Sequence, residues 1–165
     1  MKASLMIGSA FLAGASIGAW AQSPSTADQR FAKEAAGGGM AEGKLGQLAA
    51  DKGSSNFVKQ FGQKMVDDHA KANDNLKSVA SKNNITLPDN MPAKDQALYD
   101  RLSKLSGKQF DSAYIAAMKT DHKGDIAAFK REANSGTAPD VKEFASGILP
   151  VIQQHLKDLE THKVM

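Results

Sequence analysis

Two segments of the sequence repeat one spacing of residues that could bind a metal ion. Each copy has two aromatic residues, a methionine and an Asp-His pair, and the copies are Phe57, Phe61, Met65, Asp68, His69 and Phe110, Tyr114, Met118, Asp121, His122. Steps of four place the aromatic rings, the methionine and the histidine on one side of an α-helix. Each predicted helix therefore has an imidazole on an apolar stripe, where it needs a partner. Two such helices indicate a helical bundle with a polar centre.

The methionine and histidine of each copy are four residues apart and would present a thioether and an imidazole on one face. These are ligands for copper, particularly its reduced ion when thiolates are absent. A nearby carboxylate would instead admit iron, zinc or manganese. In the alternative interpretation, the methionines fill the core and each histidine is hydrogen-bonded to a neighbouring hydroxyl, carboxylate or carbonyl.

The aspartates beside the two histidines point elsewhere. Asp68 and Asp121 lie about 100° round the helix from their histidines and cannot share the same face. A role in orienting a histidine or forming a salt bridge is one possibility. We favour solvated carboxylates, as expected for Asp67 and Asp125.

Apolar periodicity and capping residues predict four long helices that would position these groups. They cover about residues 26–53, 55–83, 110–136 and 137–162, with the start of the first set by Thr26 and Gln29 at capping-box spacing. Between the second and third helices, the stretch 83–93 contains two prolines and precedes a short helix at 95–105. Extended chain at about 3.3 Å per residue, followed by helix at about 1.5 Å per residue, can run the length of the bundle. The fold class is therefore all-α, a four-helix bundle with a long crossover that makes the second and third helices parallel.

Folding the two predicted hairpins at their loops brings six side chains to the middle of the bundle. Met65 falls level with Glu42, and Met118 falls level with His155. The candidate metal ligands are Glu42, Met65, His69, Met118, His122 and His155.

Three consecutive glycines, residues 37–39, interrupt the pattern of the first helix. Each costs about 1 kcal/mol relative to alanine in a helix, so something must offset them. Either the helix breaks there, or the bare backbone allows the second helix or a ligand to approach closely beside His69. We favour close packing.

The N-terminal segment, residues 1–21, has the features of a secretory signal peptide. Lys2 precedes an apolar stretch of small residues that ends in Ala19-Trp20-Ala21, a small-x-small cleavage site. We expect the bundle domain to span residues 22–165 and to be periplasmic or secreted after cleavage. The apolar stretch is shorter than the roughly 20 residues of a spanning helix, so no transmembrane span is expected in the mature chain.

Composition excludes several classes of function. The absence of cysteine rules out disulfides, thiolate catalysis and zinc-thiolate sites in this chain of 165 residues. Lysines are dispersed among acidic residues, so the formal charge of +3 does not indicate a nucleic-acid partner. No phosphate-binding glycine loop or nucleophile motif is visible, and no catalytic residues are assigned.

Several segments resemble one bacterial family. They are residues 38–42 (GGMAE), 45–49 (LGQLA), 61–69 (FGQKMVDDH) and 102–107 (LSKLSG), together with Asp121-His122, Leu149-Pro150 and His155-Leu156. In these segments the chain resembles the family called domain of unknown function 4142. The resemblance implies a ferritin-like bundle that is typically exported, and it implies no particular chemistry. The Glu-x-x-His pattern of di-iron bundles is absent from the sequence, which argues against an iron-oxidising centre.

Two functions are compatible with these patterns. In the first, the chain is an exported bundle that binds a copper, iron or zinc ion at its centre, in envelope metal handling or stress protection, without turnover. In the second, it is a structural or partner-binding envelope bundle with no metal and no catalysis. An oxidoreductase is the least favoured alternative.

Overall fold

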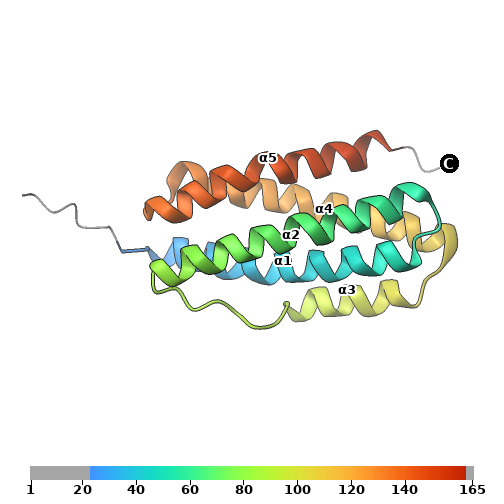
Figure 1. Ribbon diagram of the computed structural model, residues 1–165, viewed down its shortest axis with the longest axis horizontal. Helices are drawn as coiled ribbons and strands as arrows, with labels where there is room; N and C mark the ends of the chain where they lie inside the picture. The colour runs from blue at the N-terminus through green and yellow to red at the C-terminus, as the bar shows by residue number, and fades with distance from the viewer. Residues whose placement is uncertain (1–22, 163–165) are drawn as a thin grey trace, which may run out of the picture.

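The computed structural model describes residues 23–162, and the predicted signal peptide at residues 1–21 lies outside the described residues (Figure 1). The helices are α1 (Thr26–Lys52), α2 (Asn56–Lys82), α3 (Ala93–Ser103), α4 (Gly107–Ser135) and α5 (Pro139–Thr161). The predicted all-α fold is confirmed. The predicted bounds are off by a few residues, most at the start of α4 and at both ends of α3. None of the helices in residues 23–162 is long and apolar enough to cross a membrane.

Buried aspartates fix the helix ends. Ser25 caps α1 in a capping box with Asp28, one residue before the predicted pair. Asp28 also accepts a hydrogen bond from the backbone N–H of Thr137, 2.9 Å away, and so joins the start of α1 to the α4–α5 loop. At the other end of the bundle, Asp111 accepts hydrogen bonds from the backbone N–H groups of Ser54 and Ser55 at 2.9 and 2.8 Å. These contacts set both hairpin loops against the neighbouring helices.

The four long helices form two antiparallel hairpins, α1–α2 and α4–α5, packed side by side (Figure 1). Helix α1 also contacts α4, and α2 contacts α5, so α2 and α4 are diagonal neighbours that run in the same direction. The crossover and α3 run along the outside of the bundle beside α1. This is the predicted ferritin-like four-helix bundle, with the long crossover and short helix between its second and third helices.

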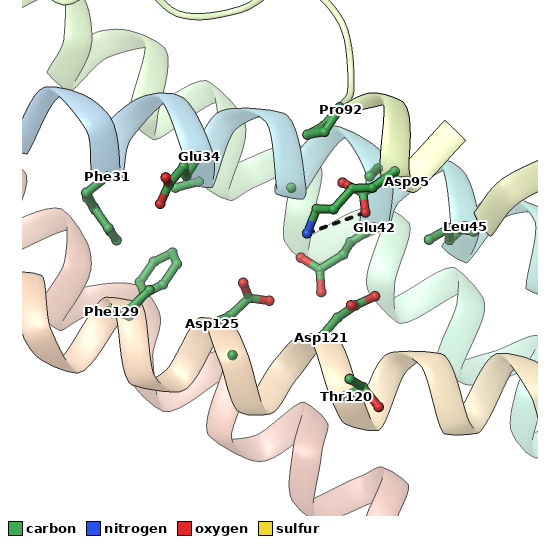
Figure 2. A pocket seen from close by; sticks show the side chains of 16 residues that line it. Phe31, Glu34, Glu42, Leu45, Pro92, Asp95, Thr120, Asp121, Asp125 and Phe129 are labelled. Atoms are coloured by element: carbon green, nitrogen blue, oxygen red, sulfur yellow. Dashed lines mark ion pairs between the residues drawn. The ribbon is translucent and has the colours of Figure 1, made fainter. Parts of the chain in front are cut away.

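The apolar core is divided into two clusters by a polar layer. One cluster contains Phe31, Leu76, Phe129, Val141, Phe144 and Ile152, and the other contains Leu45, Phe61, Met65, Phe110, Tyr114, Met118 and Leu159. The middle segment of each long helix lies between these sets and supplies the buried polar residues. A cleft opens beside this layer, between α1, α4 and the start of α3 (Figure 2).

Glycines allow close contacts along α1. The helix is continuous through residues 37–39, where a Cβ on Gly37 would lie 3.1 Å from the ring of Pro92 and one on Gly39 would lie 2.5 Å from the Asn73 side chain. Close packing therefore explains two of the three glycines. The backbones of α1 and α2 also approach closely further along, where a Cβ on Gly62 would lie 2.5 Å from the carbonyl oxygen of Gly46.

Candidate metal centre

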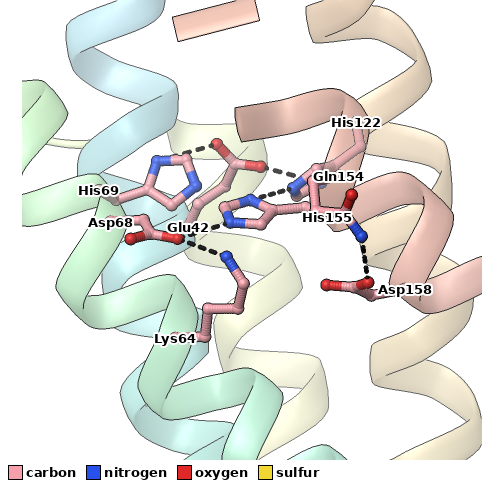
Figure 3. A network of polar contacts seen from close by, with 8 residues as sticks. All are labelled: Glu42, Lys64, Asp68, His69, His122, Gln154, His155 and Asp158. Atoms are coloured by element: carbon pink, nitrogen blue, oxygen red, sulfur yellow. Dashed lines mark hydrogen bonds and ion pairs between the residues drawn. The ribbon is translucent and has the colours of Figure 1, made fainter. Parts of the chain in front are cut away.

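Each long helix contributes one side chain to the polar layer (Figure 3). These are Glu42 from α1, His69 from α2, His122 from α4 and His155 from α5, and they are between 0% and 7% exposed. One ring nitrogen from each of the three histidines lies within 4.8 Å of the other two. The equal motif spacing and the parallel run of α2 and α4 bring His69 and His122 to the same level, as predicted.

Hydrogen-bond partners determine which nitrogen of His122 has the hydrogen. Its Nδ1 lies 3.0 Å from the carbonyl oxygen of Met118 and 3.3 Å from Oε1 of Glu42. A carbonyl oxygen can only accept, so the hydrogen of neutral His122 is on Nδ1. Its Nε2 therefore presents a lone pair.

The same reasoning fixes His155. Its Nε2 lies 2.9 Å from Oδ2 of Asp68, and that oxygen also accepts a hydrogen bond from Lys64 at 2.7 Å. Burial opposes ionisation of Asp68, but the hydrogen bonds from Lys64 and His155 outweigh it and lower the pKa of the carboxyl. Asp68 is thus an ionised acceptor, so His155 donates from Nε2 and presents the lone pair of Nδ1.

The two lone-pair nitrogens face one another. His122 Nε2 and His155 Nδ1 are 3.2 Å apart, and neutral rings leave no hydrogen to lie between them. Metal–nitrogen bonds of about 2.0–2.1 Å, at tetrahedral or octahedral angles, separate two ligand nitrogens by roughly 2.8–3.4 Å. The pair therefore has the spacing of two ligands on one ion, and each ring is oriented through its other nitrogen, as in known metal sites.

His69 completes a set of three. Its Nδ1 lies 3.6 Å from Oε2 of Glu42, and its buried Nε2 has no hydrogen-bond partner among residues 23–162. Burial lowers the pKa of His69 to about 3, that of His122 to about 4, and that of His155 as well. Repulsion from neighbouring histidines lowers the pKa values of His69 and His122 further. All three imidazoles are consequently neutral near pH 7, the protonation state in which they bind metals.

Glu42 lies against two of these imidazoles. Burial raises the pKa of its carboxyl well above the usual range, and repulsion from Asp125 and Asp121 raises it further. Its Oε1 has no hydrogen-bond partner among the described residues. Such a group would gain from a cation, and it could serve as an oxygen ligand beside the three imidazoles.

Four of the six predicted ligands thus come together, and the two methionines lie next to them in the core. Met65 and Met118 are fully buried in the apolar cluster that contains Phe61 and Tyr114. The observed contribution of Met118 to the polar layer is its backbone carbonyl. Packing accounts for both side chains, and their role as ligands stays a prediction.

The expectation that Asp68 is a solvated carboxylate was wrong, whereas Asp121 and Asp125 are half-buried and line the cleft. Asp68 is turned away from its own histidine but toward α5, where it meets His155. An oxygen of Asp125 lies within 4.8 Å of ligand atoms of Glu42 and His122. Asp125 follows His122 by three residues and shares its helix face, a signal in the sequence that could have identified it.

Comparison with known proteins places the chain in a family. The family profile described as "Domain of unknown function (DUF4142)" matches residues 15–161. The chain belongs to this family. A search of curated proteins found no match for this DUF4142 chain.

A similar solved structure is the crystal structure of a DUF305 fragment from Deinococcus radiodurans. It covers 84% of this DUF4142 chain and 96% of its own, with a TM-score of 0.74 and 12% sequence identity. At that identity the likeness supports the fold alone. Fold does not supply a function, so the function of this DUF4142 protein has to be argued from its central residues.

Proposed function

We propose that this protein is exported and that it binds one transition-metal ion at its centre, through His69, His122 and His155. The observation that supports this most is the 3.2 Å separation of two imidazole nitrogens whose outer partners leave both as lone pairs. Facing lone pairs repel unless a cation lies between them, and a metal ion is the cation that three neutral imidazoles bind. Glu42 lies on the Nδ1 side of His122, opposite the Nε2 lone pair, so we assign it to orienting the imidazoles.

The donor set favours a divalent ion. Three imidazoles with a carboxylate suit zinc, copper(II) or iron(II), whereas reduced copper prefers the sulfur ligands that here pack in the apolar cluster. Three protein nitrogens are also a common zinc arrangement. We therefore expect zinc and copper(II) to bind most tightly.

The burial of the site favours metal holding over catalysis. His122 and His155 are fully buried, and the ion would be enclosed by four helices. Handling or buffering of a metal in the cell envelope is the role we propose. It agrees with the predicted signal peptide.

Metal titration of chelator-treated protein tests the proposal. We expect calorimetry and elemental analysis to give one zinc or copper(II) ion per wild-type chain, with zinc raising the melting temperature, since an ion that binds the folded state alone stabilises it. The His122→Ala variant should lose both effects. His162→Ala is the matched control, because this fourth histidine lies beyond the centre and stacks on Phe57 with 3.7 Å between ring centroids.

Variant stability separates a ligand from a core residue. Removing a buried histidine costs about 1–3 kcal/mol through a cavity and a lost hydrogen bond, whatever metal is present. The deciding quantity is thus the metal-dependent shift within each variant. A wild-type melting temperature unchanged by zinc, copper(II) and iron(II) would overturn the proposal and leave a bundle whose histidines are structural.

A further inference from the structure

The cleft beside the metal centre has a strongly acidic wall (Figure 2). It encloses about 600 Å³ between α1, α4 and the start of α3, and its acidic side chains are Glu34, Glu42, Asp95, Asp121 and Asp125. We call it the acidic cleft. Among the described residues that line it, Lys94 is the one basic side chain, and it is largely exposed and lies 3.8 Å from Asp95.

The Glu42 carboxyl group lies at the buried floor of the acidic cleft. The Glu42 side chain lines the cleft and is 6% exposed. Its Oε1 has no hydrogen-bond partner in residues 23–162. An oxygen of Asp125 lies within 4.8 Å of a Glu42 oxygen, and Asp121 is one turn away on α4. Burial raises the pKa of Asp125 to about 6, and repulsion from Asp121 contributes. Glu42 and Asp125 therefore lie close together, Asp121 is one turn along α4, and the one basic side chain that lines the cleft among the described residues, Lys94, offsets only part of their repulsion.

The cleft also has room for an ion that keeps water ligands. Gly38 and Gly124 are in its wall, and a Cβ built on either would meet nothing within 4 Å. The rest of the wall consists of three alanines, Thr120 and larger apolar side chains, which are Phe31, Leu45, Pro92 and Phe129. Hard divalent cations use carboxylate and water oxygens together, which matches this combination.

We propose that the acidic cleft binds a second cation, a hard divalent ion of the Mn²⁺ or Ca²⁺ class, through Glu42 and Asp125, with Asp121 one turn away adding negative charge. This site is separate from the imidazole centre and differs from it in donor chemistry. Glu42 lies between the two: its Oε2 is 3.6 Å from Nδ1 of His69, its Oε1 is 3.3 Å from Nδ1 of His122, and one of its oxygens lies within 4.8 Å of an oxygen of Asp125. The competing explanation is that Glu42 and Asp125 share a proton and bind no ion.

Binding of Mn²⁺ to the chelator-treated mature protein tests the proposal, because bound Mn²⁺ loses the six-line electron paramagnetic resonance signal of the free ion. We expect one Mn²⁺ per chain in the wild type. Asp125→Asn and Asp121→Asn should each weaken binding about tenfold or more, since affinity follows the number of charged ligands. Asp67→Asn, an exposed aspartate on the outer face of α2, is the control that should bind as the wild type does.

Two results would overturn the second site. One is a full free-ion signal at millimolar Mn²⁺ with wild-type protein, which would favour the shared proton. The other is Mn²⁺ binding that is lost in His155→Ala but kept in Asp125→Asn, because the ion would then occupy the imidazole centre. Zinc titration of the same variants distinguishes the two proposals. If the wild type binds Mn²⁺ but not zinc, the imidazole centre is contradicted and the second site is not.

Discussion

Replacing Asp68 by asparagine should weaken zinc binding without removing a ligand. Asp68 accepts the Nε2 hydrogen of His155 at 2.9 Å and so directs the lone pair of the other nitrogen toward His122. Asparagine keeps the shape and can still accept that hydrogen bond through its carbonyl. It removes the negative charge that makes the imidazole a stronger donor to a metal.

The expected loss of zinc affinity follows from the position of Asp68, which is hydrogen-bonded to the outer nitrogen of the proposed ligand His155. Loss of such an outer partner typically lowers metal affinity about 10- to 100-fold, which is about 1.4–2.7 kcal/mol. At saturating zinc, the stabilisation by bound metal should fall by this amount, or by roughly 3–10 °C in melting temperature for a chain of this size. The metal-free protein should change little, because the lost Lys64 pair is partly exposed and such helix pairs contribute about 0.3–0.5 kcal/mol.

Calorimetric melting with and without zinc measures this difference directly. Asp67→Asn is the matched control, since it makes the same chemical change one residue earlier on an exposed face. Equal zinc-dependent shifts in wild type, Asp67→Asn and Asp68→Asn would refute the reasoning that Asp68 sets the donor nitrogen of His155.

Three further predictions concern other parts of the chain. Burial and a neighbouring aspartate raise the pKa of Glu132 to about 7, so its contribution to stability is full below pH 4.5 and is lost as the pH rises through 7. Melting of the metal-free protein at pH 5.5 and 8.5 should show a loss of stability that Glu132→Gln reduces, and equal losses in the two proteins would contradict this. Gly62→Ala should lower the free energy of unfolding by several kcal/mol, because the added Cβ would lie 2.5 Å from the Gly46 carbonyl oxygen. In the same denaturant unfolding experiment the control Gly147→Ala, whose Cβ meets nothing within 4 Å, should be neutral or slightly stabilising, and equal effects of the two variants would argue against the close crossing. The exported protein should begin at Gln22, which intact-mass measurement of secreted material would check; a mass that includes the first 21 residues would show that the segment is retained.

The fold could be predicted because its signals are local and repeated. Apolar residues recur at helical spacing, and two prolines mark the one stretch that cannot continue a helix. The long crossover allowed parallel α2 and α4, and the equal spacing of the two Asp-His motifs favoured that arrangement, which the structure confirms. Register within the first hairpin was also close, since Gly46 lies against Gly62 and places the backbone of Glu42 level with that of Met65.

The centre could be predicted only in part, because side-chain direction decides it. Helical side chains lean toward the N-terminus of their helix, so the long Glu42 side chain leans from the level of Met65 toward His69. Whether a carboxylate about 100° from a histidine is solvated depends on the neighbouring helix, and Asp68 meets α5 there. The lone-pair pattern depends on distances of a few tenths of an ångström, which no sequence periodicity encodes.

The division of the central residues between the two hairpins has a kinetic consequence. Glu42 and His69 belong to α1–α2, whereas His122 and His155 belong to α4–α5, and the Asp68–His155 hydrogen bond also joins the two halves. A bound ion would therefore crosslink the two hairpins across their interface, and its ligands could separate fully only when that interface opens. The residence time of the ion would then follow the opening rate of the bundle and not the intrinsic rate of ligand exchange. A protein of this design would therefore release its metal slowly, and any change that separates the two hairpins would speed the release.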